Sequence, residues 1–281
     1  MHESTRSLVL VTVLISAFSA TGAVAQPAKA APAAPKTTKI DVGPAVQKLK
    51  SGSEEQIRAA LDELRIAATG ASAAAPAVAD VLTRGLNEPL AQQAIDTLGD
   101  LEASEGSVIL ALYANHRALT LRRAAVKALT RTKGAPAAVT LRHALGDADP
   151  VVRGTAAVGL GALKAKDTVP DLFLALDHKV NEAAVSVGQL CNADQCDQLA
   201  QKIGKLPFDV VTSGLDQILF RPATEVADDT KIKVIGRLRE LGTGEANRFL
   251  SDVDKRLAKD TSPRVKQAIE QAVKATSGGS Q

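Results

Sequence analysis

The side chains best suited to metal binding or nucleophilic chemistry are three histidines and two cysteines. His116, His143 and His178 are 27 and 35 residues apart, so a fold with a repeat near thirty residues would place them in a row. A metal site needs ligands that converge within about 2 Å of one ion, and no H-E-x-x-H, phosphate-binding glycine loop or G-x-S-x-G accompanies these residues. We therefore expect solvated histidines at helix ends, with no catalytic residue, metal or cofactor.

The two cysteines stand in the sequence "LCNADQC", as Cys191 and Cys196. The hydrophobic pattern places the first at the end of one helix and the second early in the next. In an exported protein, two cysteines across a tight turn form a disulfide. Their spacing is not the C-x-x-C of redox-active pairs, and two ligands are too few for zinc. We predict a structural disulfide.

The first residues have the features of an export signal. Arg6 precedes an apolar run from Leu8 to Phe18, and an A-x-A site follows at 23–25. The run is too short for a transmembrane anchor, although a retained anchor remains the alternative. We predict a signal peptide over 1–25, cleaved after Ala25, and a periplasmic or secreted protein without an integral membrane span after cleavage. An Ala/Pro-rich disordered tether (26–40) and a disordered tail (276–281) flank the predicted fold.

The composition favours closely packed helices. Of the 281 residues, 45% are hydrophobic but only 2% are aromatic, with no Trp and one Tyr. Small aliphatic side chains let helix backbones approach each other. The net charge of +3 is too small to indicate a class of partner.

A repeat near thirty residues organises residues 41–275. Similar helical segments end at leucines separated by 34, 31, 31, 30 and 29 residues: Leu64, Leu98, Leu129, Leu160, Leu190 and Leu219. Two more segments end at Leu241 and Val273, after intervals of 22 and 32. A second, shorter apolar segment lies between most of them. Each unit is therefore a hairpin in which the shorter segment forms the first helix, the A helix, and the segment that ends at a leucine forms the second, the B helix. The chain is an all-α solenoid of about seven to eight such helical hairpins. The interval of 22 predicts a degenerate repeat or loop near 220–228.

The most regular unit, residues 147–160, reads D-x-D-P-x-V-R-x-x-A-A-x-x-L. This pattern resembles HEAT repeats, particularly the short bacterial HEAT-like repeats of phycobilisome lyases. The resemblance implies a right-handed α-solenoid. It also implies a ladder between repeats made by an Asp in the turn and an Arg early in the B helix, here Asp147 and Arg153. Arg122 matches the Arg position one repeat earlier, where the turn lacks the Asp.

In stacked HEAT-like units the B helices line the concave side. We call the six leucines from Leu64 to Leu219 that end these helices the anchor leucines, and the positions six and two residues before each of them should face the concave side. We call them the B-helix strip: Arg58, Asp62, Gln92, Asp96, Arg123, Lys127, Gly154, Val158, Ala184, Gly188, Ser213 and Gln217. In the third unit, Arg123 and Lys127 form a cationic row that Arg131 continues at the same four-residue interval. A trough of small residues flanked by cations could accept an extended peptide or a helix. The alternative is that these charges only maintain solubility.

The C-terminal part from Lys231 carries eleven basic and six acidic residues, a net charge of +5. Interleaved signs are typical of a solvated helix face. A weak contact of these helices with an acidic surface is left open.

The pattern therefore predicts an exported, non-enzymatic scaffold that binds another protein or a peptide on its concave face. A bilin-lyase-like enzyme, or another ligand-binding protein built on the same repeat, is the alternative. Export and the scarcity of aromatic residues argue against a chromophore cleft. A nucleic-acid binder is disfavoured because the strip mixes charge signs and lacks stacking aromatics. Sequence alone does not identify the partner.

Overall fold

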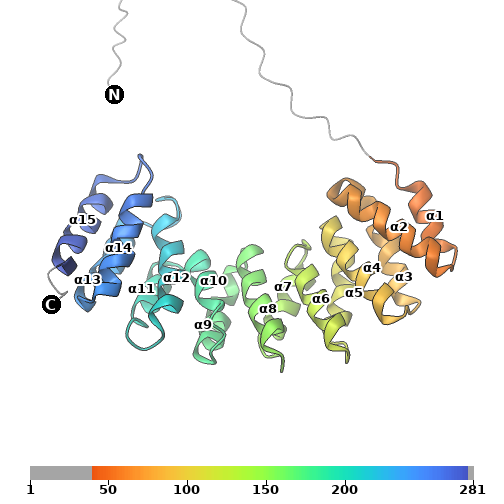
Figure 1. The fold of residues 1–281 in the computed structure, drawn as a ribbon, viewed down its shortest axis with the longest axis horizontal. Helices are drawn as coiled ribbons and strands as arrows, with labels where there is room; N and C mark the ends of the chain where they lie inside the picture. The colour runs from red at the N-terminus through yellow and green to blue at the C-terminus, as the bar shows by residue number, and fades with distance from the viewer. Residues whose placement is uncertain (1–39, 278–281) are drawn as a thin grey trace, which may run out of the picture. The chain divides into compact units, whose positions relative to one another are not determined.

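The chain folds into two rows of short helices, and the predicted all-α solenoid is confirmed. The computed structural model describes residues 40–277. This range contains fifteen α-helices and three 3-10 helices, with no strand beyond an isolated bridge between Ile203 and Leu206. Figure 1 shows the helices standing side by side in chain order. The predicted signal peptide and tether fall on 1–39, outside the described residues. The last helix continues to Ser277, two residues into the predicted tail.

The B row consists of every second helix from the second to the fourteenth. Each B helix packs against the B helices before and after it. The row comprises α2 (Glu54–Ala67), α4 (Glu88–Leu101), α6 (Leu119–Leu129), α8 (Pro150–Ala162), α10 (Ala183–Leu190), α12 (Phe208–Phe220) and α14 (Gly244–Arg256).

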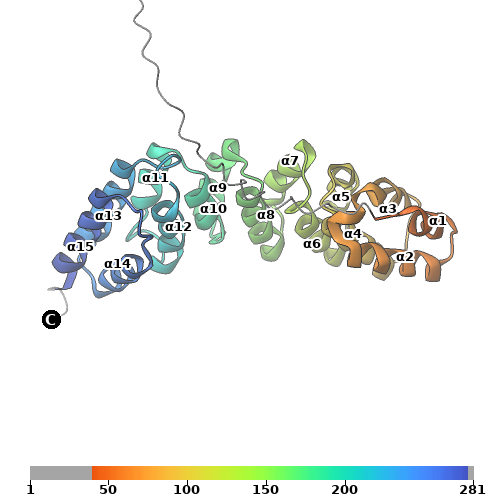
Figure 2. The same ribbon diagram turned by 90° about the horizontal axis from the view of Figure 1, so that it is seen from above.

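The A row contains the remaining α-helices, and each of the first seven packs on the B helix that follows it. The two rows are seen separated in Figure 2. The row comprises α1 (Gly43–Lys50), α3 (Ala75–Thr83), α5 (Ser107–Tyr113), α7 (Ala135–Ala144), α9 (Val169–Asp177), α11 (Ala193–Ala200), α13 (Asp228–Leu241) and α15 (Pro263–Ser277). Seven hairpins and one further helix therefore make up the stack, in agreement with the predicted seven to eight.

Proline and side-chain caps explain where many helices begin. Proline occupies the first turn of seven helices, α1, α3, α4, α7, α8, α9 and α15. Its missing N–H is harmless there, because the first amides of a helix lack intrahelical acceptors. The Asn87 side chain accepts a hydrogen bond from the Leu90 amide at 3.1 Å, and Asp149 accepts one from Val152 at 3.0 Å. Proline and the capping side chains at these turns thus determine where the helices begin.

The stretch Glu54–Thr83 is long and apolar enough to cross a membrane by length and composition. In the structure it is divided into α2, the 3-10 helix η1 (Ala68–Ala74) and α3. The break falls at Ala68, whose φ of 47° does not continue an α-helix. Both α-helices pack on α1 and α4, so this stretch belongs to the stack. Two further 3-10 turns, η2 (Ser104–Gly106) and η3 (Lys166–Thr168), lead into α5 and α9.

A single apolar core runs through the described stack and consists mainly of Ala, Leu and Val. The nearly all-apolar α8 lies inside it, packed on α6, α7 and α10. Seven of its thirteen residues are buried. An interior unit of a solenoid buries its faces on its neighbours, which explains why this helix has so little polar surface.

The register of the last repeats differs from the one the sequence suggested. The spacing of Leu241 and Val273 predicts that the helices ending there are B helices, and this prediction is wrong. Helix α13 packs on α11 and α15, so it lies in the A row, whereas α14 packs on α12 in the B row. The short interval arises because α13 follows α12 directly through residues 221–227, which contain no helix. Helix α13 then takes the position of the expected A helix.

Candidate interaction surfaces

The structure divides the B-helix strip into exposed and buried positions. Its polar residues at the N-terminal end are exposed, apart from half-buried Asp96, and Val158 is also exposed. Gly154, Ala184 and Gly188 are buried. A Cβ atom added to Gly188 would lie 2.1 Å from the carbonyl oxygen of Gly214, so α10 and α12 touch through their backbones there. The predicted small-residue trough is therefore wrong, since these residues permit close packing between B helices.

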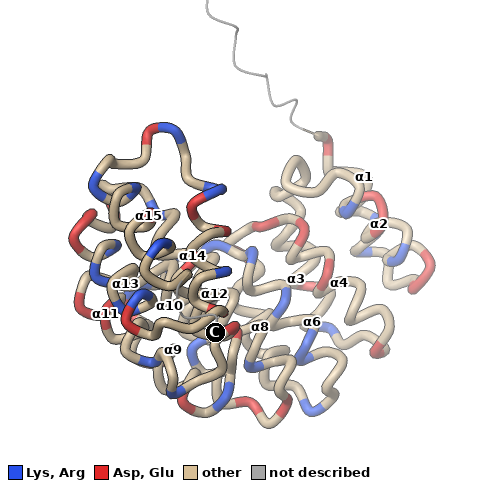
Figure 3. Tube along the Cα trace, turned by 60° about the vertical axis from the view of Figure 1, so that its left-hand side comes forward, with Lys and Arg blue, Asp and Glu red and all other residues tan. Residues whose placement is uncertain are grey.

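The charged end of the strip is an ionic network between repeats. Asp100 binds two arginines, with its Oδ2 3.0 Å from Nε of Arg65 and its Oδ1 2.7 Å from Nη1 of Arg131. It thereby connects three successive repeats. Burial raises the pKa of nearby Asp96, although Arg65, Lys127 and Arg131 oppose the shift. In the view of Figure 3, basic and acidic segments alternate along the described helices.

Arg123 is likewise engaged rather than free. Its Nε and Nη2 donate to the two carboxylate oxygens of Asp149 at 3.0 and 2.6 Å. This bidentate pair lowers the pKa of Asp149 to about 2. Arg65 and Asp100 were missed by the sequence reasoning because, apart from Arg131, it considered only positions before each anchor leucine. They lie one and two residues after Leu64 and Leu98, and their partner Arg131, which the sequence analysis did name, lies two residues after Leu129.

The predicted ladder has a different pairing from the one proposed. Arg153 donates its Nη1 to the backbone oxygen of Asp147 at 2.8 Å, within one repeat. The contact between repeats is made by Arg122, whose Nε and Nη2 lie 3.0 and 3.2 Å from the Asp147 carboxylate. The turn of the preceding repeat needs no Asp for this, because Arg122 binds forward, to the turn of the next repeat.

The predicted disulfide joins Cys191 and Cys196, with 2.05 Å between the sulfur atoms. Both cysteines are buried. Arg221, which follows α12, donates to the backbone oxygen of Cys191 at 2.9 Å. The bridged turn is thus linked to the next repeat.

The basic residues of the last helices are partly paired. Arg264 binds Asp229 at 2.7 Å, and Arg237 binds Glu240 at 3.3 Å. Arg256 pairs with Asp216 and lies over the Phe220 ring, 4.6 Å from its centre. The Arg264 and Arg256 pairs join different helices, whereas the Arg237 pair lies within α13, and all three reduce the charge available to an acidic surface.

The histidines do not form a common cluster. His116 stacks on Tyr113, with ring centres 5.6 Å apart. His143 and His178 line one cavity. Within residues 40–277, no group of three or more His, Cys, Asp or Glu side chains is arranged to hold a metal ion.

Sequence reasoning also missed a surface on the A row. Four apolar side chains are largely exposed: Val108 (63%) and Leu112 (66%) on α5, Val139 (56%) on α7, and Leu174 (60%) on α9. We call them the A-helix apolar row. Their positions correspond when the repeats are aligned on the buried leucines Leu110, Leu141 and Leu172, so they share one face. The signal was present as apolar residues two before or after these leucines.

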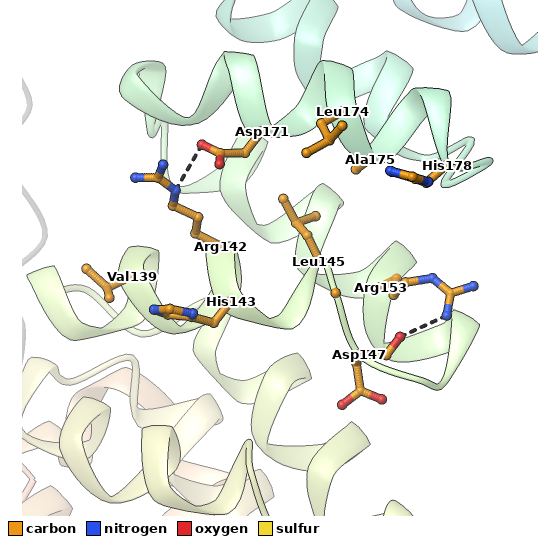
Figure 4. A pocket seen from close by; sticks show the side chains of 11 residues that line it. Val139, Arg142, His143, Leu145, Asp147, Arg153, Asp171, Leu174, Ala175 and His178 are labelled. Atoms are coloured by element: carbon orange, nitrogen blue, oxygen red, sulfur yellow. Dashed lines mark hydrogen bonds and ion pairs between the residues drawn. The ribbon is translucent and has the colours of Figure 1, made fainter.

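A cavity of about 840 Å³ lies between α7 and α9. Val139, Leu145, Leu174 and Ala175 supply its apolar lining. Figure 4 shows Arg142 and Asp171 at one end and Arg153 with His178 at the other. The Arg142 Nε is 2.9 Å from Asp171 Oδ2. The α7–α9 cavity is thus an apolar groove with charged ends, and it is continuous with the A-helix apolar row through Val139 and Leu174.

Two rows of helices stacked in hairpins define an α-solenoid of the helical-repeat class. Residues 106–189 match the sequence model described as HEAT repeats. The chain therefore contains HEAT-like repeats, and the matched segment includes helices α7 and α9, which flank the cavity.

Solved structures share this architecture at low identity. The chain is similar to the CpcE–CpcF complex of phycocyanin lyase from Nostoc sp. PCC7120 (18% identity, TM-score 0.45, covering 91% of this chain and 100% of that one). It is similar to a homology model of the full-length AP-3 complex in an intermediate open conformation (15% identity, TM-score 0.50, covering 82% of this chain and 50% of that one). It is also similar to a designed armadillo repeat protein (16% identity, TM-score 0.32, covering 83% of this chain and 98% of that one). No curated protein matches the chain. At these identities the likeness concerns the fold alone.

Proposed function

We propose that this chain is an exported, non-enzymatic scaffold that binds a partner protein or peptide through its A row. The observation that carries the proposal is the A-helix apolar row together with the α7–α9 cavity beside it. Exposed apolar side chains clustered over several elements mark interaction sites. On the B row, where the sequence suggested binding, the small residues Ala184 and Gly188 are buried between helices, and Asp100 and Arg123 are engaged in ion pairs.

The energetics of the surface support a protein partner. Fully burying a Val or Leu side chain contributes about 1.5–3 kcal/mol, so covering each of these largely exposed residues is worth about 1–2 kcal/mol. The four side chains extend over three consecutive repeats, a longer span than a small ligand contacts. Solenoids offer extended surfaces of this kind to macromolecules.

Variants of the apolar row test the proposal. Tagged chain would be purified from its own cells as wild type, as Leu112→Asp/Leu174→Asp, and as the control Ile66→Asp. Ile66 is 88% exposed on α2, so its replacement adds a charge at a site away from the A row. We expect the wild type and the control to retain the same partner at constant stoichiometry, and the double variant to lose it with an unchanged melting temperature. Identical sets of bound proteins for all three would contradict the proposal.

Export has its own test. The signal-like segment at 1–25 supports a periplasmic or secreted location. Cell fractionation followed by N-terminal sequencing should find a chain that begins at Gln26 outside the cytoplasm. A cytoplasmic chain that begins at Met1 would contradict this part of the proposal.

A further inference from the structure

We propose that the α7–α9 cavity receives an acidic side chain of a partner peptide, with the carboxylate bound by Arg153 and the flanking apolar side chains lying over Leu145 and Leu174. This inference rests on the proposed function and specifies the chemistry of the partner. It is drawn from a comparison of two equivalent arginines in adjacent repeats.

Arg122 and Arg153 each bind the turn of their own repeat in the same way. Arg122 donates its Nη1 to the backbone oxygens of the residues six and five positions earlier, at 3.1 and 3.4 Å. Arg153 donates its Nη1 to the corresponding oxygens at 2.8 and 2.9 Å. These contacts fix both guanidinium groups and leave the Nε and Nη2 edge of each available.

The two arginines differ in what occupies that edge. Arg122 uses it to bind the carboxylate of Asp147 in the next repeat. The residue equivalent to Asp147 one repeat later is Asp177, which instead pairs with Lys202. Within residues 40–277, no carboxylate lies within 4.0 Å of the Arg153 nitrogens, and the Nε and Nη2 of Arg153 donate no hydrogen bond. Arg122 therefore shows that the Nε and Nη2 edge of an arginine at this position binds a carboxylate. The same edge of Arg153 has no carboxylate of the described residues bound to it.

The surroundings of Arg153 favour a carboxylate attached to an apolar body. Arg153 is half-buried and lines the same cavity as Leu145, Leu174 and His178. At the other end, Arg142 is already paired with Asp171, so the cavity has one unpaired arginine (Figure 4). A fixed, partly desolvated guanidinium binds carboxylates bidentately and more strongly than a solvated one.

A peptide fits this site better than a small carboxylic acid. The cavity volume of about 840 Å³ accommodates several side chains. Its apolar wall continues along the A-helix apolar row to α5, so the occupant gains contacts by extending beyond the cavity. An acidic residue next to Leu, Ile or Phe in an extended segment or a helix combines both features.

Peptide selection provides the test. A library of random peptides displayed on phage would be panned on the full exported chain, and the strongest binder would be synthesised with a fluorescent label. We expect selected peptides to carry Asp or Glu near apolar residues. Changing that residue to Asn or Gln, or changing Arg153→Gln in the protein, should each weaken binding at least tenfold. The two changes together should weaken binding no more than either alone.

Further variants separate the outcomes. Arg153→Lys keeps the charge and a donor to the turn but not the bidentate geometry, so it should retain part of the affinity. Arg248→Gln, an exposed change on α14, should have no effect, and circular dichroism would check folding. If Leu174→Asp abolishes binding but Arg153→Gln and loss of the peptide carboxylate have no coupled effect, the inference is overturned while the proposed function stands. If no peptide is selected, or if Leu174→Asp has no effect either, both fail.

Discussion

Replacing single glycines in the B row by alanine distinguishes close helix packing from an open trough. Gly154 and Gly188 were both predicted to line such a trough. At a solvent-facing position inside a helix, Gly→Ala stabilises by about 1 kcal/mol, because alanine has the higher helix propensity. An open trough therefore predicts the same stabilisation at both sites.

The structure predicts opposite signs. At Gly154 the nearest atoms to an added Cβ are those of the Glu182 carboxylate, at 2.8 Å, and this exposed, flexible side chain can move away. At Gly188 the nearest atom is the backbone oxygen of Gly214, at 2.1 Å, which cannot move without separating α10 from α12. Overpacking costs about 1–3 kcal/mol, and a contact this short with backbone belongs to the upper part of that range, about 2–3 kcal/mol. After subtraction of the propensity gain, we expect Gly188→Ala to destabilise by roughly 1–2 kcal/mol.

Thermal unfolding followed by circular dichroism measures the difference. For a domain of this size, 1 kcal/mol corresponds to about 2–4 °C in Tm. Gly154→Ala should therefore raise Tm by up to about 4 °C, and Gly188→Ala should lower it by roughly 2–8 °C. Gly214→Ala is an independent check, because its Cβ would lie 2.4 Å from the Ala184 oxygen and should also destabilise. A rise in Tm for Gly188→Ala would refute the packing argument.

Three further predictions concern stability and function. Replacing Cys191 and Cys196 together by serine should lower the free energy of unfolding in urea by about 2 kcal/mol, because the disulfide closes a short loop; an unchanged midpoint would contradict this. The Asp149 pKa of about 2 lies below the ordinary 3.8, so its pair with Arg123 stabilises the fold above pH 3.8 and is lost as the pH falls towards 2. Arg123→Gln should therefore flatten the dependence of urea stability on pH between 2 and 4, and an unaltered slope would exclude the pair as its cause. Adding a linear tetrapyrrole should leave the bilin absorbance spectrum unchanged, whereas a shifted spectrum would favour a lyase-like protein.

The repeat and the disulfide could be predicted because they depend on local sequence features. Anchor leucines such as Leu160 recur at one helical position, and every unit needs its neighbours to bury them. Cys191 and Cys196 lie across one tight turn, so their pairing needs no knowledge of distant residues. These features follow from chain proximity and hydrophobic periodicity.

The exposed faces could not be predicted in the same way. Whether Gly188 faces solvent or another backbone depends on the distance between α10 and α12, which small side chains on both helices set together. The partners of Arg153 depend on whether Lys202 or the arginine binds Asp177, a competition between repeats. The register of α13 depends on a connection too short to hold a helix. Each of these outcomes is decided by contacts between repeats rather than within one.

The difference between the two rows explains why binding is assigned to the A side. In the middle of the stack, B helices approach through glycine and alanine, as at Gly188 and Gly214, and polar side chains such as Asp100 bridge what remains. The A helices there are short, seven to ten residues in α5, α7 and α9, and 3-10 turns lead into two of them. Helices α7 and α9 do not pack closely on each other, so Leu174 stays exposed and a cavity separates the two helices. The tightness of one row thus leaves the apolar surface of the other available to a partner.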